Sequence, residues 1–256
     1  MNFEISSYFL NQRRLELDNY ILNNRIQIRN IKPSLISTLG RKIPIKPVQY
    51  LTNSFFESTF HYSPLAISEP VRGSYFGYFQ SPKYFSDYST EIRKMFTLPS
   101  VSKSLTLLIE SIDFQETVAI HVRRGDYVGK ENFHGLSTEL YFRKAIDLVN
   151  ANGSTKKIVV FTEDYSTAKT MFPEAWKIIT PEILGSPSEN LALIAKFAHF
   201  IGSNSSFSWW GAFLSENRRG YTIFPRPWFS NTGFNDRDLL MPDWITLGNG
   251  VTNVND

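Results

Sequence analysis

The sequence predicts an α/β fold built on a parallel, doubly wound sheet. Residues 116–224 alternate short apolar runs with segments of helical periodicity, which is the pattern of successive β-strand and α-helix units. Several of the apolar runs end in charged or hydroxyl side chains, as expected where the strands of an open α/β sheet face a ligand. With 256 residues and a hydrophobic content of 42%, the chain can form one large domain or two smaller ones.

Five strands are expected, at residues 117–122, 157–162, 176–180, 199–203 and 221–224. The expected helices lie between them, at residues 137–150, 165–172, 189–198 and 206–216. One face of the first helix gathers apolar side chains and is predicted to meet the core, namely Leu140, Tyr141, Ala145, Leu148 and Val149. Residues 1–110 have weak periodicity, many aromatic residues and several prolines, and the polar tail 247–256 is expected to fray.

Composition excludes several classes of protein. The absence of cysteine excludes disulfides, thiolate metal sites and a cysteine nucleophile, and fits a reducing compartment. A net charge of +3 with scattered Lys and Arg argues against nucleic acid as a partner. The N-terminus has no signal-peptide pattern, and no apolar run is long enough to span a membrane. We expect a cytoplasmic protein, at most peripheral at the inner face of a membrane.

The most informative segment is residues 118–127, an apolar strand that ends on Arg123, Arg124, Gly125 and Asp126. Adjacent guanidinium groups suit an anion with several oxygens, because each offers a planar fork of donors and stays charged. The pattern therefore favours a phosphate-bearing ligand with a carboxylate beside it. A surface ion pair is the equally weighted alternative.

A second segment, residues 200–212, runs from a strand through polar residues into an apolar helix. Ser205 or Ser206 is expected to cap that helix, and its first turn could bind an anion. Simple capping needs only one hydroxyl, whereas this segment has more polar side chains, at Ser203, Asn204, Ser205, Ser206 and Ser208. Trp209 and Trp210 are expected to pack inside the protein.

A third strand, residues 158–162, ends in the carboxylates of Glu163 and Asp164. A carboxylate at this place can accept paired N–H bonds from a guanine edge. Asp164 could equally be the N-cap of the following helix.

These segments resemble the α-1,2-fucosyltransferases of glycosyltransferase family 11. HVRRGDYV (121–128) and SNSSFSWWGA (203–212) carry the resemblance most specifically, followed by the FHG of residues 133–135. Weaker similarities follow in the same order along the chain, at residues 15–18, 77–81, 224–229 and 238–244.

The resemblance implies a GT-B-like fold with two facing Rossmann-type domains, an N-terminal acceptor-side domain at 1–112, expected to be truncated and incomplete, and a GDP-sugar-binding domain at 113–256. It implies a metal-independent, inverting transfer of fucose from GDP-fucose to the 2-hydroxyl of a sugar, typically galactose, without a cofactor. The partners would be a nucleotide-sugar donor and a glycan acceptor.

By the same resemblance, Arg123 and Arg124 would clamp the pyrophosphate, and Asp164 would hold the guanine. The other donor-binding residues would be His121, Asn204, Ser205, Ser206, Phe207 and Ser208, whereas His134 and Gln80 would lie on the acceptor side. Asp126 is the candidate catalytic base, with orientation of an arginine as its alternative role. His121 could instead be a packed histidine, and His134 a loop-packing residue. The D-x-D of Asp236 and Asp238 is interpreted as a chance match and not as a metal site.

The chain also departs from the family pattern. Family members open with a strand and a Gly-Gly-Leu-Gly-Asn-Gln segment, whereas this sequence starts at Met1 and soon reaches residues 15–18. A remnant that binds GDP without turnover therefore stays open as an alternative to a working transferase. The aromatic content of 15% leaves a non-enzymatic carbohydrate-binding protein as a second alternative.

Overall fold

The main sheet is parallel, as the sequence predicts, and it has six strands where five were expected. The computed structural model describes residues 2–6, 27–31, 55–57, 60–68, 75–98, 100–124, 135–151, 156–215, 219–231 and 233–249. The sheet has the order β10-β9-β8-β5-β6-β7, and each pair of neighbours is parallel. Its strands are β5 (Thr117–Val122), β6 (Lys157–Thr162), β7 (Lys177–Ile179), β8 (His199–Ile201), β9 (Thr222–Arg226) and β10 (Ile245–Gly248).

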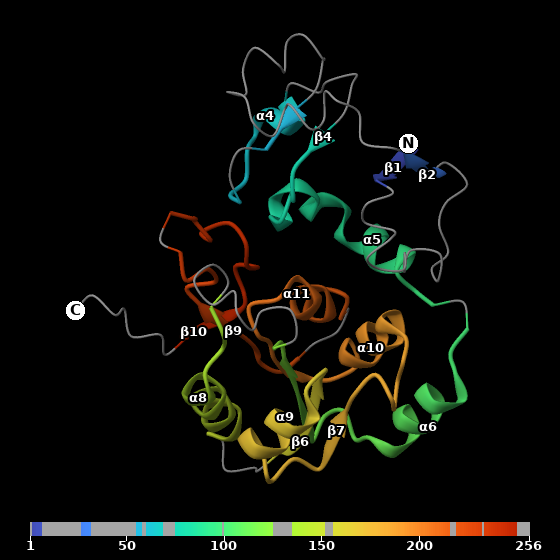
Figure 1. Cartoon of the computed structure of the whole chain (residues 1–256), viewed down its shortest axis with the longest axis vertical. Helices are drawn as coiled ribbons and strands as arrows, with labels where there is room; N and C mark the ends of the chain where they lie inside the picture. Colours follow the sequence, from blue (N-terminus) through green and yellow to red (C-terminus); the bar gives the residue numbers. More distant parts are fainter. Residues whose placement is uncertain are drawn as a thin grey trace, which may run out of the picture.

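Helices cover both faces of this sheet, because successive side chains of a strand point to opposite sides. Ala119 of β5 packs in a cluster with α6 (Lys103–Ser111), α10 (Pro187–Ile194) and α11 (Ser206–Phe213). Its neighbours Val118 and Ile120 pack in a second cluster with α8 (Glu139–Asn150) and α9 (Tyr165–Met171). Figure 1 shows the resulting layers, which match the GT-B-like, Rossmann-type α/β expectation.

The strand order reverses between β5 and β8. From β5 the chain adds β6 and β7 on one side, then returns to place β8, β9 and β10 on the other. In open α/β sheets the crevice at such a reversal, beyond the carboxyl ends of the strands, is where ligands bind. The residues that follow β5 and β8 are therefore the first place to look for a site.

The predicted elements are found with small shifts at their ends. β5 and β6 have the predicted bounds, and α10 begins two residues earlier than expected. The shift arises because Ser186 caps that helix and Pro187 occupies its first turn, where a missing N–H costs nothing. α11 ends at Phe213, earlier than the predicted residue 216.

Two expectations are wrong. Leu140 is 55% exposed, because the buried stripe of α8 is centred on Tyr141, Ala145 and Val149, which repeat every four residues. The tail is not wholly frayed either. Its first two residues, 247 and 248, belong to β10, which pairs with β9 at the edge of the sheet.

The part of the chain before the sheet contains elements that the sequence did not predict. β1 (Asn2–Ser6) pairs with β2 (Gln27–Ile31), and β3 (Phe55–Phe56) pairs with β4 (Tyr75–Phe76), both in parallel. The short helices α4 (Leu65–Ser68), η2 (Pro82–Tyr84) and η3 (Ser86–Tyr88) and the helix α5 (Ser89–Met95) follow the same part of the chain. In Figure 1, α4 and β4 lie at one end of the molecule and α5 lies between them and the sheet.

Several contacts fasten this region to the sheet-bearing part, among them an ion pair and a hydrogen bond. Lys83 Nζ lies 2.6 Å from Asp238 Oδ1, and Arg93 Nε donates to the carbonyl of Phe213 at 2.7 Å. α6 lies before the expected boundary at residue 112, yet Leu105 and Leu108 pack into the core on one face of the sheet. The division at residue 112 stays a prediction.

Candidate functional site

Three strand ends bring the sequence-predicted residues together. β5 lies between β8 and β6 in the sheet, so the residues after these three strands meet at one edge. Arg123 and Arg124 follow β5, Glu163 and Asp164 follow β6, and residues 202–206 follow β8. The three motifs found separately in the sequence therefore form one site.

Arg123 is held by contacts on both sides. Its guanidinium Nη1 lies 2.5 Å from Glu163 Oε1, and its backbone N–H donates to Ser203 Oγ at 3.2 Å. The side chain of Arg123 is only 14% exposed, whereas that of Glu163 is 48% exposed. The ion pair thus fixes the direction of a largely buried guanidinium at the mouth of the strand-end crevice.

Arg124 presents a donor that the described residues do not satisfy. Its Nε is buried and finds no hydrogen-bond partner among the residues that the structure describes. A buried donor without a partner costs free energy, and a functional role is one of the explanations for such a group in a native protein. Arg124 also lies close enough to Asp164 for its charge to act on that carboxyl group.

Asp164 caps the helix α9. Its two oxygens accept from the backbone N–H of Thr167 at 3.0 Å and from the Thr167 hydroxyl at 2.6 Å. These bonds, with a smaller contribution from the Arg124 charge, lower the pKa of Asp164 below its ordinary value. The capping role foreseen as the alternative is therefore present, and contact with a guanine stays a prediction.

His121 is buried beneath the loop that follows β8. Its Nδ1 lies 2.5 Å from Ser208 Oγ and 3.4 Å from Ser203 Oγ, and the two hydroxyl oxygens are 3.2 Å apart. Burial, and less strongly the Arg123 charge, lower the pKa of His121 to about 3, so its imidazole is neutral at ordinary pH. His121 thus joins β5 to α11 through serine hydroxyls and not through the backbone.

The start of α11 forms the third side of the site. Ser205 is its N-cap and accepts from the backbone N–H of Phe207 at 3.2 Å. Ser206 is exposed at the first position of the helix, and the Phe207 ring packs against His121 with 5.1 Å between centroids. Free N–H groups at this end of a helix favour an anion.

Asn204 lies behind this surface. It is 1% exposed, and its amide nitrogen donates to the carbonyls of Gly135 at 3.2 Å and Trp228 at 3.0 Å. Its amide oxygen accepts from the hydroxyl of Ser137 at 3.2 Å. Asn204 thus ties its own loop to the segments that contain Gly135 and Trp228, and a direct contact with the donor stays a prediction.

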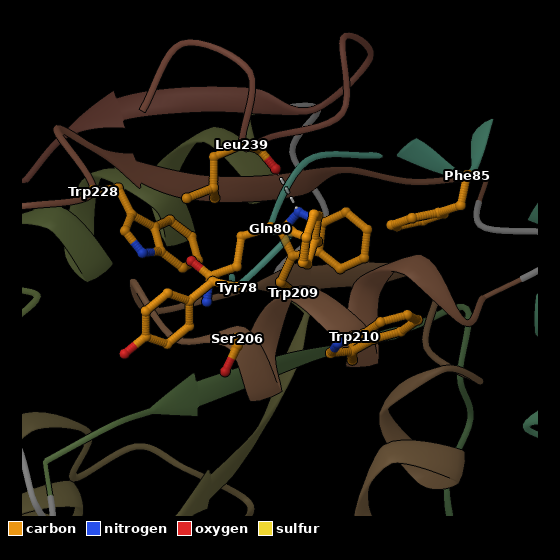
Figure 2. A pocket seen from close by; sticks show the side chains of 9 residues that line it. Tyr78, Gln80, Phe85, Ser206, Trp209, Trp210, Trp228 and Leu239 are labelled. Carbon is orange, nitrogen blue, oxygen red and sulfur yellow. Dashed lines mark hydrogen bonds between the residues drawn. The ribbon is translucent and has the colours of Figure 1, made fainter. Parts of the chain in front are cut away.

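A pocket opens beside Ser206. Its volume is about 140 Å³. Figure 2 shows Gln80 and Tyr78 from the segment before η2 facing Ser206 and Trp228 across it, with Trp209 bonded to the carbonyl of Leu239. The remaining lining side chains are Phe79, Phe85 and Trp210. A largely aromatic wall with a few polar groups suits the apolar face and the hydroxyls of a sugar ring.

Trp209 and Trp210 pack inside the protein, as expected, and they also line the pocket. Trp209 is 6% exposed and Trp210 packs partly buried against the same cluster. Both also line the pocket beside Ser206. Each tryptophan therefore has a side that faces the pocket, which the helical pattern did not indicate.

Two candidate residues lie outside the described part of the chain. These are Asp126, the expected base, and His134, expected on the acceptor side. Their roles stay predictions.

Both aspartates of the D-x-D segment form hydrogen bonds and ion pairs within the protein. Asp236 accepts from the backbone N–H of Trp228 at 2.7 Å and pairs with Arg226 at 3.2 Å. Asp238 accepts from Lys83 and from the backbone N–H of Tyr62. Among the residues that the structure describes, no group of His, Asp and Glu is arranged to hold a metal ion.

Sequence reasoning named Glu163 and Ser203 but not their contacts. Glu163, noted only for its place after β6, pairs with Arg123, and Ser203 bonds both Arg123 and His121. The part of the pocket wall formed by Tyr78, Phe79 and Phe85 was missed because these residues lie in a segment of weak periodicity. No helix in the described ranges is long and apolar enough to cross a membrane.

Known proteins are similar to this chain along most of its length. The model of the family described as Glycosyl transferase family 11 matches residues 15–248, which include every strand of the main sheet. An Escherichia coli protein named alpha-1,2-colitosyltransferase is 30% identical over 242 residues, covering 91% of this chain and 81% of that protein. A second Escherichia coli protein, the O-antigen biosynthesis glycosyltransferase WbnK, is 27% identical and covers 94% of this chain and 88% of its own length.

A mammalian relative is more distant. The galactoside 2-alpha-L-fucosyltransferase Sec1 of Mus musculus is 25% identical over 229 residues. The match covers 84% of this chain but only 60% of the mouse protein.

Proposed function

Since the chain belongs to glycosyl transferase family 11 and is a glycosyltransferase, we propose that it transfers a 6-deoxyhexose from a GDP-sugar to the 2-hydroxyl of a galactose-terminated glycan. Fucose and its 3-deoxy derivative colitose are the candidate sugars, because two of the similar proteins are named for transfer of one or the other. The observation that carries the proposal is the buried Nε of Arg124, which lies after β5, where the strand order reverses. This donor finds no hydrogen-bond partner among the described residues.

In the proposed mechanism the site stabilises the leaving group. Departure of GDP leaves negative charge on the β-phosphate, and fixed donors placed where that charge develops lower the barrier. Arg124 supplies one fork of donors, and Arg123, oriented by Glu163, supplies another. The N–H groups at the start of α11 complete the set, so we propose that transfer needs no metal ion.

The acceptor approaches from the side of the aromatic pocket. Gln80 and Ser206 offer hydrogen bonds there, and the rings of Tyr78 and Trp228 offer flat apolar surfaces. An acceptor hydroxyl must attack opposite the departing GDP for the reaction to invert the sugar. We assign removal of its proton to the carboxylate of Asp126, on the resemblance of its motif.

The proposal is tested by incubating the protein separately with GDP-fucose and GDP-colitose, each with lactose as a galactose-terminated acceptor and an excess of EDTA. We expect GDP release and a trisaccharide with one of the two donors. A folded sample that binds GDP without forming product would identify a GDP-binding remnant. Lactose binding that is indifferent to Arg124→Ala, without GDP binding, would identify a carbohydrate-binding protein.

A further inference from the structure

One carboxylate outside the strand-end site controls the shape of the aromatic pocket. Glu57 directly follows β3, and its backbone N–H donates to the carbonyl of Phe76 at 2.8 Å, which extends the pairing of β3 with β4. Its Oε2 accepts from the backbone N–H groups of Tyr78 at 2.8 Å and Phe79 at 2.7 Å. A single oxygen thus holds two successive residues of the pocket wall.

The second oxygen of Glu57 is also engaged. Oε1 accepts from the hydroxyl of Tyr84 at 2.9 Å, and the same hydroxyl accepts from the backbone N–H of Ser63 at 2.9 Å. Burial, together with the Glu57 carboxylate, raises the pKa of Tyr84 to about 12, so the phenol keeps the proton that it donates. The far end of the segment is fixed by Ser81, whose hydroxyl donates to the carbonyl of Asp238 at 2.7 Å.

The backbone of the held segment is strained at one residue. Phe79 has a φ of +48°, a left-handed conformation that a residue with a Cβ adopts at a cost. The backbone N–H of Phe79 donates to the Glu57 carboxylate. The carboxylate therefore stabilises a turn that the chain would otherwise avoid. Gly77 allows this arrangement, because a Cβ there would lie 2.5 Å from the Cβ of Glu57.

The turn decides which side chains face the pocket. Tyr78, Phe79 and Gln80 all line it, whereas Glu57 does not. We infer that Glu57 is a positioning residue for acceptor binding, which sets the Phe79 turn and so directs Tyr78 and Gln80 toward the sugar. This inference rests on the proposed function, because it assigns the pocket to the acceptor glycan.

The test compares Glu57→Ala with Glu57→Gln. Glutamine keeps an oxygen that can accept both N–H bonds, whereas alanine removes them. With whichever of GDP-fucose and GDP-colitose the wild type accepts as donor, Glu57→Ala should raise the KM for lactose about tenfold or more, and Glu57→Gln should stay within about threefold of the wild type. GDP affinity should change by less than about twofold in both variants, because the strand-end site is untouched.

Two further measurements separate positioning from general support of the fold. Hydrogen–deuterium exchange of the Tyr78 and Phe79 amides should accelerate in Glu57→Ala and not in Glu57→Gln. In a Phe79→Gly background, where glycine adopts the left-handed turn freely, Glu57→Ala should raise the lactose KM much less than in the wild type. An equal effect in both backgrounds would overturn the inference.

The remaining outcomes are also decisive. An unchanged lactose KM in folded Glu57→Ala would overturn the inference, as would a parallel loss of GDP affinity. If the wild type transfers neither fucose nor colitose, the proposed function fails. The inference is then decided by lactose binding, followed through the fluorescence of the pocket tryptophans, Trp209, Trp210 and Trp228. Weaker binding by Glu57→Ala would support it, and a wild type that binds no lactose would overturn it.

Discussion

His121 Nδ1 lies 2.5 Å from Ser208 Oγ, which joins the central strand β5 to the helix α11 inside the protein. Ser208 is fully buried, so Ser208→Ala leaves His121 Nδ1 with the Ser203 hydroxyl, at 3.4 Å, as its partner among the described residues. We expect a loss of about 1–3 kcal/mol in the free energy of unfolding, measured by urea denaturation. Ser206→Ala, an exposed hydroxyl in the same helix, should stay within about 0.5 kcal/mol of the wild type. Equal losses in the two variants would contradict the role given to His121.

The lowered pKa of His121 predicts a pH dependence of stability. The folded value is about 3 and the ordinary value is 6.5, so the neutral imidazole favours folding above pH 6.5. That stability is lost as the pH falls from 6.5 toward 3, with a slope of at most about 1.4 kcal/mol per pH unit.

The window between pH 6.5 and 4.5 isolates this effect. The lowered carboxyl pKa values of Asp164, Glu182 and Asp238 stabilise the fold at higher pH, and their contribution is lost only below about 4.5. Unfolding free energies measured across the window should fall with pH in the wild type and change little in His121→Gln. A wild type with a flat profile would show that the imidazole is not buried neutral.

Arg124 should dominate the affinity for GDP. Removing a charged donor that bonds a phosphate oxygen costs about 1.5–3 kcal/mol, so Arg124→Ala should weaken GDP binding by about 10–150-fold in calorimetry. Arg124→Lys keeps the charge but loses the planar fork, and its affinity should fall between those of the wild type and Arg124→Ala. Arg143→Ala removes the same charge from α8, where Arg143 pairs with Glu174, and should leave GDP affinity unchanged. Equal effects at Arg124 and Arg143 would show that only net charge matters.

Gln80 should matter for the acceptor and not for the donor. Its side chain faces the pocket opposite Ser206, so its truncation removes about one hydrogen bond to the glycan. Gln80→Ala should raise the KM for lactose about fivefold while GDP affinity stays constant. A changed GDP affinity with an unchanged lactose KM would place the acceptor elsewhere.

The fully buried strands of the sheet were predictable from the sequence. β5 and β6 are continuous apolar runs buried on both faces, so their bounds match the prediction. β10 was missed because it is four residues long and its burial alternates at the edge of the sheet. Leu140 was misplaced because neighbouring residues on a helix differ by about 100° in direction, which makes the border of an apolar face uncertain.

The contacts within the site were less predictable than its members. Arg123, Asp164 and Ser205 were found because they stand directly after predicted strands, and parallel strands end at the same edge of a sheet. The pairing of Arg123 with Glu163 joins residues 40 apart, and Glu57 reaches Tyr78 across 21 residues. Such contacts depend on strand register and on a left-handed turn at Phe79, neither of which local periodicity contains.

The NMR spectrum of the product tests the central claim most directly. With the wild type, lactose and the accepted GDP-sugar, the account predicts one new α-linked 6-deoxyhexose on the 2-oxygen of galactose, formed in EDTA and strongly reduced in Arg124→Ala. A folded wild type that forms no such product with either donor, or a product whose yield is unaffected by Arg124→Ala, would contradict it.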